Sequence, residues 1–333
     1  MNWKKQVVMV TGGTGSFGKE FIRIVLKENK PAKVIVFSRD ELKQHEMREA
    51  GFNQANLRYF IGDVRDLSRL QRAMDGVDII VHAAALKQVP ACEYNPMEAI
   101  KTNILGTANV IEAALETSVS KVVALSTDKA VNPINLYGAT KLAAEKLTVQ
   151  SNAYSGERPT RFSCVRYGNV IGSRGSVVPS FLRQREHGKL SITDERMTRF
   201  WLSLEQGVRF VLRCIEIMQG GEVFVPKIPS TSIVDLAKAI APEAELDVIG
   251  IRPGEKLHEV MCPRDDSHLT LEFNDHFVIR PTIRFHSHNV RYESNGLGES
   301  GAPVAEGFEY ESGSNPHFLS VAELRELNRA VGA

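Results

Sequence analysis

The sequence predicts an α/β protein whose larger domain is a doubly wound parallel sheet of about seven strands, joined to a smaller, discontinuous C-terminal domain. Three observations support this fold class. Short runs rich in Val and Ile alternate with helical patterns over the first two-thirds of the 333 residues. These runs lack polar alternation, which is typical of strands buried on both faces of a parallel sheet. A glycine-rich segment directly follows the first run, where a strand would turn into a helix.

The candidate strands are six apolar segments in the first half of the chain and a seventh further on. They are Gln6–Val10, Lys33–Phe37, Leu57–Ile61, Asp78–His82, Lys121–Leu125, Arg161–Val165 and Glu222–Val225. The helical patterns lie between them, at Phe17–Asn29, Asp40–Ala50, Leu67–Met74, Pro96–Leu115, Tyr137–Tyr154 and Leu204–Met218. This alternation of strand and helix predicts parallel strands joined by helical crossovers.

The alternation is interrupted twice, which indicates a second domain assembled from separate segments. The loop-forming sequence Gly172–Gly175 begins the first interruption, and the second begins near Ala241. We therefore expect a larger domain from residues 1–171 and about 200–240, and a smaller one from about 172–199 and 241–333. Within the smaller domain, the polar stretch Glu293–Gly301 predicts a loop.

Composition and charge narrow the functional classes. The 41 Lys and Arg residues balance 40 Asp and Glu residues, so the net charge of +1 predicts no nucleic-acid partner. The cysteines are widely spaced, as is typical of core thiols rather than a disulfide framework or zinc site. The N-terminal segment lacks the apolar core of a signal peptide, and no apolar run reaches the ~18 residues of a membrane span. We expect a cytoplasmic protein with no membrane partner.

The glycine-rich segment Thr11–Lys19 is the first candidate binding site. Its glycines allow a tight turn and a close approach to a pyrophosphate, while free amides at the helix start face the anion. Glu20 stands where a P-loop needs a Ser or Thr hydroxyl for Mg²⁺, so a nucleotide triphosphatase is disfavoured. The strand–turn–helix context favours a Rossmann-like dinucleotide site over a glycine turn that binds nothing. The predicted contacts are Gly12, Thr14, Gly15, Ser16, Phe17 and Gly18.

The end of the second strand distinguishes NAD from NADP. NAD sites usually have an acidic residue there that binds the ribose hydroxyls. Here Ser38 and Arg39 form the turn, and Lys43 follows on the helix that Asp40 opens. Because a guanidinium binds a 2′-phosphate in bidentate fashion, we favour NADP. The alternative is that Asp40 only caps the helix and Arg39 is a solvated charge.

A Tyr–Lys pair follows the fifth strand. Tyr137 and Lys141 are four residues apart and share one helix face. A nearby ammonium and a cationic nicotinamide stabilise the phenolate, so we expect the pKa of Tyr137 to be lowered toward neutrality. Such a pair takes a proton from a substrate hydroxyl while the cofactor takes a hydride. Just upstream, Thr127, Asp128 and Lys129 add a second acid and base.

Together these motifs resemble the extended short-chain dehydrogenases/reductases and, more narrowly, the inverting UDP-N-acetylglucosamine 4,6-dehydratases. The superfamily resemblance rests on Thr11–Gly18, Gly62–Val64, His82–Ala85, Ser126–Thr127 and Tyr137-x-x-x-Lys141. The narrower resemblance rests on Phe37–Gln44, Ala83–Lys87, Ser126–Lys129, Arg166–Val170, Arg174–Pro179, Met197–Phe200 and Gly250–Glu259. It covers nearly the whole chain and becomes weaker after Phe285.

The resemblance implies NADP-dependent loss of water from UDP-N-acetylglucosamine with inversion at carbon 5, the first step of pseudaminic acid biosynthesis for flagellin glycosylation. It implies that Lys129 is the base at carbon 5 and that Asp128 assists the loss of water, with Thr127, Tyr137 and Lys141 completing the catalytic set. Lys129 then needs a lowered pKa and Asp128 a raised one. The alternative for this adjacent pair is a solvated turn.

The resemblance also implies further ligand contacts. For the cofactor these are Asp63, Val64, Ala83, Ala84, Ala85, Lys87, Tyr137, Lys141 and Val170. For the sugar nucleotide they are Lys87, Thr102, Asn103, Asn169, Val178, Thr193, Arg199, Arg252 and Glu255. The two arginines suit a diphosphate and Glu255 a ribose hydroxyl, although each is alternatively a surface charge or a cap. His286 and His288 have no further ligands beside them in the sequence, so no metal site is predicted.

Two other functions remain open on the sequence. A UDP-sugar 4-epimerase needs only the Tyr–Lys pair and the cofactor, and it releases no water. A regulator that binds NADP without catalysis would not need Tyr137 and Lys141. The resemblance further implies a homo-oligomer, a hexamer built as a trimer of dimers, and the helices Pro96–Leu115 and Tyr137–Tyr154 could pair across a dimer.

Overall fold

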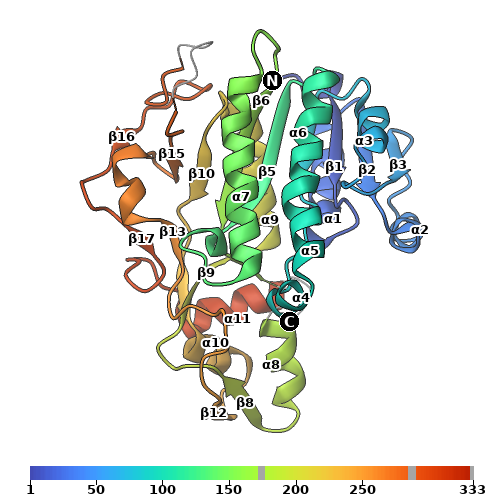
Figure 1. The fold of residues 1–333 in the computed structure, drawn as a ribbon. Helices are drawn as coiled ribbons and strands as arrows, with labels where there is room; N and C mark the ends of the chain where they lie inside the picture. Colours follow the sequence, from blue (N-terminus) through green and yellow to red (C-terminus); the bar gives the residue numbers. More distant parts are fainter. Residues whose placement is uncertain (172–176, 284–289, 331–333) are drawn as a thin grey trace.

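In the described part of the chain, seven parallel strands form the centre of the molecule in the order β3-β2-β1-β4-β5-β6-β10 (Figure 1). The computed structural model describes residues 1–171, 177–283 and 290–330. The strands span Val7–Thr11 (β1), Lys33–Ser38 (β2), Leu57–Ile61 (β3), Ile79–His82 (β4), Lys121–Thr127 (β5), Arg161–Tyr167 (β6) and Val223–Pro226 (β10). The predicted doubly wound sheet is confirmed. Because β1 lies between β2 and β4, the carboxyl end of β1 is the switch point where such sheets bind ligands.

Helices cover both faces of this sheet. On one face lie α1, α2 and α9, and on the other lie α3, α6 and α7. They span Ser16–Ile24 (α1), Glu41–Glu49 (α2), Leu67–Met74 (α3), Gly106–Glu116 (α6), Leu136–Gln150 (α7) and Leu204–Ile217 (α9). Along β1, Val8 and Val10 join one core while Met9 joins the other, and all three are fully buried. Burial on both faces explains why the strands show no polar alternation.

The helix predicted over Pro96–Leu115 is present but interrupted. It begins as α5 (Pro96–Ala99), widens into a π-helical turn at Ile100–Leu105 and continues as α6. A short helix that the sequence analysis did not predict, α4 (Val89–Tyr94), precedes it. Turns of this π type often occur at functional sites, so the interruption marks a place to look for positioned side chains.

The sheet continues beyond β10 with antiparallel strands from the C-terminal third. Strand β15 (His276–Ile279) pairs with β10, β14 (Thr270–Glu272) pairs with β15, and β16 (Ala302–Pro303) forms the edge. The sequence analysis assigns these residues to the smaller domain. In the structure, β14, β15 and β16 extend the larger sheet, because the buried strand His276–Ile279 pairs with β10.

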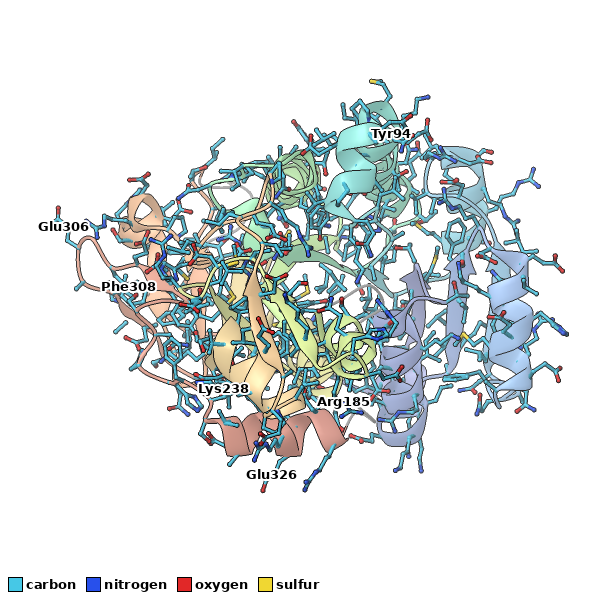
Figure 2. All side chains as sticks on the ribbon, turned by 90° about the horizontal axis from the view of Figure 1, so that it is seen from below. Tyr94, Arg185, Lys238, Glu306, Phe308 and Glu326 are labelled. Atoms are coloured by element: carbon cyan, nitrogen blue, oxygen red, sulfur yellow. The ribbon has the colours of Figure 1, made fainter. Side chains whose placement is uncertain are left out.

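The smaller domain packs around its own core below the carboxyl ends of the parallel strands (Figure 1). Its elements are α8 (Val177–Arg185), β8 (Lys189–Ile192), α10 (Ile233–Ile240), β12 (Glu245–Val248) and α11 (Val321–Ala330). Figure 2, which looks from below, shows Lys238 on α10 and Glu326 on α11 on neighbouring helices. Two small sheets join this domain to the larger one.

These sheets are β7 (Asn169–Val170), β9 (Thr198–Leu202) and β11 (Ser230–Ser232), and the pair β13 (Val260–Cys262) and β17 (Tyr310–Glu311). The predicted loop Gly172–Gly175 lies outside the described residues, as do His286 and His288.

Candidate functional site

The glycine-rich turn packs closely against the end of β4. Gly12 has a φ of +66°, and a Cβ there would lie 2.9 Å from the Cα and N atoms of Ala84. A Cβ at Gly18 would lie 2.5 Å from the Cα of Gly13. Gly15 is the N-cap of α1 and supplies no side-chain cap, so the first amides of the helix are available to an anion. The turn therefore has the backbone geometry of a pyrophosphate cradle.

The end of β2 meets this turn. Thr14 Oγ1 lies 2.8 Å from Ser38 Oγ, and both side chains are buried. Asp40 does cap α2, since it accepts a hydrogen bond from the Lys43 amide at 3.0 Å and pairs with the Lys43 ammonium. That part of the alternative interpretation is therefore correct. Arg39 is more than half exposed and lies 3.7 Å from Asp63, at the end of the next strand, β3.

The end of β4 completes this edge of the sheet. The Ala83 amide donates to the Thr11 carbonyl at 3.2 Å, which holds the segment Ala83–Ala85 beside the glycine-rich turn. Lys87 follows on the same loop, and burial lowers its pKa. Val64 lies at the end of β3 and is buried against Gly106. The structure thus brings the predicted cofactor residues of β1, β2, β3 and β4 to one edge.

A buried cluster of one ammonium and two carboxylates lies where β5 ends. Thr127 closes β5, and Asp128 and Lys129 begin a short 3-10 helix. Lys129 Nζ lies 3.1 Å from Asp128 Oδ1 and 3.0 Å from Glu259 Oε1. Thr127 also donates to Asp128 Oδ1, at 2.9 Å. Because Asp128 is 1% exposed and Glu259 is 2% exposed, the alternative of a solvated turn is wrong.

The two carboxylates control the protonation of Lys129. Burial alone lowers the pKa of Lys129, but the charges of Asp128 and Glu259 outweigh it and raise the pKa above its usual value. The predicted lowering is therefore wrong, because the sequence does not reveal the second carboxylate. The raised pKa predicted for Asp128 is confirmed: burial raises it, Glu259 adds to the rise, and Lys129 opposes it.

Glu259 was missed by the sequence analysis. It comes from the segment before β13, and its amide donates to Ser312 Oγ at 2.9 Å while its carbonyl accepts from the Ser312 amide at 2.8 Å. Burial raises the pKa of Glu259, but the charges of Lys129, Arg199 and Lys256 outweigh burial and lower it. The only available signal was its place at the end of the stretch Gly250–Glu259, which gave it no role.

Tyr137 lies in the first turn of α7, beside this cluster. Asn135 caps the helix by accepting from the Gly138 amide at 2.7 Å. Burial raises the pKa of Tyr137 to about 12, although the charge of Lys129 and a hydrogen bond with Thr127 oppose the rise. The protein's side chains therefore do not lower this pKa as predicted. A lowering would require the nicotinamide cation that the prediction includes.

Lys141 lies one turn along α7 from Tyr137, as predicted. Its ammonium is buried and donates to the Leu125 carbonyl at 2.6 Å. Burial lowers the pKa of Lys141. The cation is thus fixed beneath the carboxyl end of β5, on the helix that carries the tyrosine.

Thr102 and Asn103 lie in the π-helical turn before α6. Asn103 Oδ1 accepts from the Leu86 amide at 2.8 Å, and its Nδ2 donates to the Leu86 carbonyl at 2.8 Å and to Thr140 Oγ1 at 3.0 Å. This side chain therefore holds the loop after β4 against α7. Thr102 is 6% exposed, and its hydroxyl has no hydrogen-bond partner among the described residues.

Of the predicted substrate residues, Arg199 lies beside the acid–base cluster, and Arg252 and Glu255 lie on a loop held to the start of α7. Arg199, on β9, is close enough to lower the pKa of Glu259, and it donates to the Leu257 carbonyl at 3.1 Å. Arg252 and Glu255 lie 3.8 Å apart on one loop. Asn135 fastens this loop to the start of α7 by donating to the Gly254 carbonyl at 2.8 Å.

The remaining predicted residues lie where the two domains join or within the smaller one. Asn169 and Val170 form β7, which pairs with β9. Val178 is fully buried in the core of the smaller domain, and Thr193 donates to Met197 Sδ at 2.8 Å. The side chain of Val178 thus packs inside the domain.

The described residues contain neither a metal-binding group nor a membrane-spanning helix. Within 1–171, 177–283 and 290–330, no group of three or more His, Cys, Asp or Glu side chains is placed to hold a metal ion. In the same part of the chain, no helix combines the length and apolar character needed to cross a membrane. The four cysteines, Cys92, Cys164, Cys214 and Cys262, are buried and free.

Comparison with known sequences identifies relatives over nearly the whole chain. A family model described as polysaccharide biosynthesis protein matches residues 8–281. A UDP-N-acetylglucosamine 4,6-dehydratase (inverting) from Campylobacter jejuni is 56% identical over 327 residues, covering 98% of each chain. A UDP-glucose 4-epimerase from Rickettsia massiliae is 45% identical over 331 residues, covering 97% of this chain and 95% of the epimerase.

Solved structures have a similar fold. Pen from Bacillus thuringiensis has a TM-score of 0.89 at 39% identity and covers 99% of this chain and 100% of its own. The dTDP-glucose 4,6-dehydratase DesIV from Streptomyces venezuelae, solved with NAD and TYD bound, has a TM-score of 0.67 at 23% identity, covers 76% of this chain and 87% of its own, and shows the fold alone. The chain belongs to the polysaccharide biosynthesis protein family and, as an extended short-chain dehydrogenase/reductase, to the inverting dehydratases within it.

Proposed function

We propose that the protein is an NADP-dependent UDP-N-acetylglucosamine 4,6-dehydratase that inverts carbon 5. Its product would be UDP-2-acetamido-2,6-dideoxy-β-L-arabino-hex-4-ulose, which begins pseudaminic acid biosynthesis for flagellin glycosylation. The observation that carries the proposal is the pair of buried Asp128 and partly exposed Lys129 beside Tyr137. Epimerisation needs only the tyrosine and the cofactor, whereas loss of water needs this additional acid and base. The Campylobacter jejuni relative of the same name supports the choice of substrate.

The edge of the sheet fits a dinucleotide. Gly12 and Gly18 leave no room for a Cβ, and the uncapped amides of α1 suit a pyrophosphate. Ser38 and Arg39 would hold the 2′-phosphate, with Lys43 nearby on α2. A nicotinamide bound there would supply hydride transfer, that is, oxidation at carbon 4 of the sugar and the matching reduction at carbon 6.

The chain's own residues move the protons. With a bound nicotinamide cation to lower its pKa, Tyr137 would react as the phenolate and accept the proton of the carbon-4 hydroxyl, with Lys141 on the same helix face. Lys129 would first pass its ammonium proton to Asp128, whose Oδ1 lies 3.1 Å away. As the neutral amine, it would then take the proton from carbon 5, which is acidic once carbon 4 is a ketone. Asp128 would give its proton to the carbon-6 hydroxyl, which leaves as water. Its raised pKa suits an acid that must hold this proton beforehand. Reprotonation of carbon 5 from the opposite face would invert that centre.

The smaller domain, built from α8, β8, α10, β12 and α11, would hold the sugar nucleotide. Arg199 and Arg252 are suited to the diphosphate and Glu255 to a ribose hydroxyl, because charge-assisted hydrogen bonds to these groups are strong. The remaining contacts proposed for the sugar nucleotide are Lys87, Thr102, Asn103, Asn169, Val178 and Thr193. The larger domain would hold the cofactor.

We also propose that the protein is a cytoplasmic homo-oligomer, a hexamer built as a trimer of dimers. Large apolar side chains are exposed on the helices of one face: Met97 is 56% exposed, Leu105 is 51% exposed and Leu147 is 38% exposed. Tyr94 on α4 is 88% exposed, and Figure 2 shows it at the periphery of the molecule. Exposed apolar side chains of this kind suit a helix-mediated dimer contact. Light scattering after size exclusion tests this, and a monomer would contradict it.

Incubation with UDP-N-acetylglucosamine tests the activity and separates the alternatives. Mass spectrometry of the product should show the loss of one water. A product of unchanged mass would instead indicate the 4-epimerase, which the 45% identity to the Rickettsia massiliae epimerase keeps as the second candidate. If the protein binds NADP but converts no substrate, the result would indicate the non-catalytic regulator.

A further inference from the structure

A second carboxylate faces Asp128 across the Lys129 ammonium, and it takes part in none of the proposed proton transfers. Glu259 Oε1 lies 3.0 Å from Lys129 Nζ. Its other oxygen, Oε2, is buried and has no hydrogen-bond partner among the described residues. Lys256 Nζ lies 3.7 Å from that oxygen. Burying a carboxylate costs free energy unless nearby positive charges compensate it. Here Lys129 and Lys256 supply those charges.

The position of Glu259 does not depend on its carboxylate. Its main chain is held through both its amide and its carbonyl by Ser312. Ser312 Oγ in turn lies 2.8 Å from Thr198 Oγ1, on β9. The segment is therefore fixed by hydrogen bonds that a change in the side chain's charge would leave in place.

We propose that Glu259 is a positioning residue for the dehydration step: it holds Lys129 against Asp128 and favours the extra proton that this pair receives from carbon 5. The inference rests on the proposed dehydratase activity. When the carbon–hydrogen bond at carbon 5 breaks, its electron pair stays on the sugar and the Asp128–Lys129 pair gains one proton. The pair then consists of a carboxylic acid and an ammonium with a net charge of +1, and a fixed negative charge 3.0 Å from Lys129 stabilises it.

The other charged groups around the cluster set the direction of the effect. Arg199 and Lys256 are cations that act on Glu259, and Lys256 also repels the Lys129 ammonium. Tyr137 faces Lys129 and Asp128 from α7 and is neutral at its raised pKa. Among these groups, Glu259 is the carboxylate whose charge adds to the proton affinity of both Asp128 and Lys129.

The substitution Glu259→Gln removes the charge and keeps the shape of the side chain. We expect kcat to fall roughly 10- to 100-fold, with little change in KM, because carbon-5 deprotonation loses its electrostatic support. The acid limb of the kcat–pH profile should move to lower pH, because the pair binds its proton less tightly. Since oxidation at carbon 4 comes first, the absorbance of reduced nicotinamide should build up during turnover.

Lys256→Met provides a second test with the opposite sign. Removing this cation leaves the Glu259 charge less compensated, so the same limb should move to higher pH. Glu311→Gln, on β17 opposite Val260, is the matched control and should keep the wild-type rate and profile. If Glu259→Gln fails to fold, the Lys256→Met shift decides the question.

The two proposals fail in different ways. An unmoved acid limb in folded Glu259→Gln, or a shift to lower pH in Lys256→Met, would overturn the role of Glu259 while leaving the dehydratase intact. A wild-type protein that releases no water from UDP-N-acetylglucosamine would overturn the proposed function itself.

Discussion

The cofactor edge and the acid–base cluster are built in different ways. The cofactor edge begins with a single contiguous segment, Thr11–Lys19, whose glycines pack against the neighbouring β4. The acid–base cluster joins Lys129, at the end of β5, to Glu259, in the segment before β13. A contiguous motif can be recognised from the sequence, whereas the charge state of Lys129 depends on a carboxylate that only the fold brings to it.

The largest effect should come from the cluster. Lys129→Ala removes the proposed carbon-5 base, so we expect dehydration to fall at least about 10³-fold. NADP binding, measured by calorimetry, should be unchanged, because Lys129 is not among the proposed cofactor contacts. Lys146→Ala, an exposed position on the same α7 as Tyr137, is the control and should retain activity. Near-normal turnover in Lys129→Ala would show that the cluster is not the source of the base.

A substitution at the cofactor edge should instead weaken the binding of NADP. Gly12→Ala places a Cβ 2.9 Å from the Ala84 backbone at a φ of +66°, so the turn must shift. We expect the affinity for NADP to fall at least about tenfold and the stability to fall by ~2 kcal/mol. Calorimetry and thermal unfolding measure the two effects.

Gly76→Ala is the control variant, which separates the effect of backbone strain from that of a steric clash. Gly76 has a similar φ of +71°, but nothing lies within 4 Å of its Cβ position. It should lose only about 1 kcal/mol of stability and keep its NADP affinity. Equal losses in the two variants would contradict the close packing of the glycine-rich turn.

The pH dependence of stability should report on the cofactor edge. His82 bridges Thr11 and Thr107 at 2.7 and 3.0 Å, and complete burial, aided by the charge of Lys141, lowers its pKa from 6.5 to about 3. Between these values the unfolded chain binds a proton that the folded chain does not, so stability is complete above about pH 6.5 and falls toward pH 3.

Replacing this histidine should reduce that pH dependence. In His82→Gln, the free energy of unfolding, measured by denaturant at a series of pH values, should fall less steeply over the same window. An identical slope in the wild type and the variant would mean that other buried groups dominate the acid sensitivity.

The smallest expected effect concerns the choice between NAD and NADP. Arg39→Ala should weaken NADP binding about tenfold and leave NAD binding unchanged, since it removes one charge-assisted contact at an exposed position. Calorimetric titrations with both cofactors measure this. Equal affinities of the wild-type protein for NAD and NADP would refute the role of Arg39.

Most of the fold could be predicted because its signals are local. The strands of the parallel sheet are apolar runs, and α3 spans the predicted residues Leu67–Met74. The extension through β15 could not be predicted, since pairing His276–Ile279 with β10 is a long-range contact. The π-helical turn at Ile100–Leu105 could not be predicted either, because the pattern over Pro96–Leu115 is that of one continuous helix.

In the candidate site, too, the local features could be predicted and the long-range ones could not. The sequence predicts the positions of Tyr137 and Lys141 on one helix, and that prediction needs only helical spacing. The pKa direction predicted for Lys129 was wrong because it depends on Glu259. Burial raises the pKa of Tyr137, and the predicted lowering needs the nicotinamide cation as well. Electrostatic properties of a buried group follow from all of its neighbours, and one of the neighbours of Lys129 lies in a distant part of the chain.

The most direct measurement is the reaction of the wild-type protein with UDP-N-acetylglucosamine in deuterium oxide, followed by NMR of the product. We predict a 4-keto product that has lost one water, carries one deuterium at carbon 5, and has the inverted configuration there. A product that retains its original hydrogen at carbon 5 would contradict the proposed proton transfer at the Asp128–Lys129 pair. Retained configuration would contradict inversion, and an epimer of unchanged mass would contradict dehydration itself.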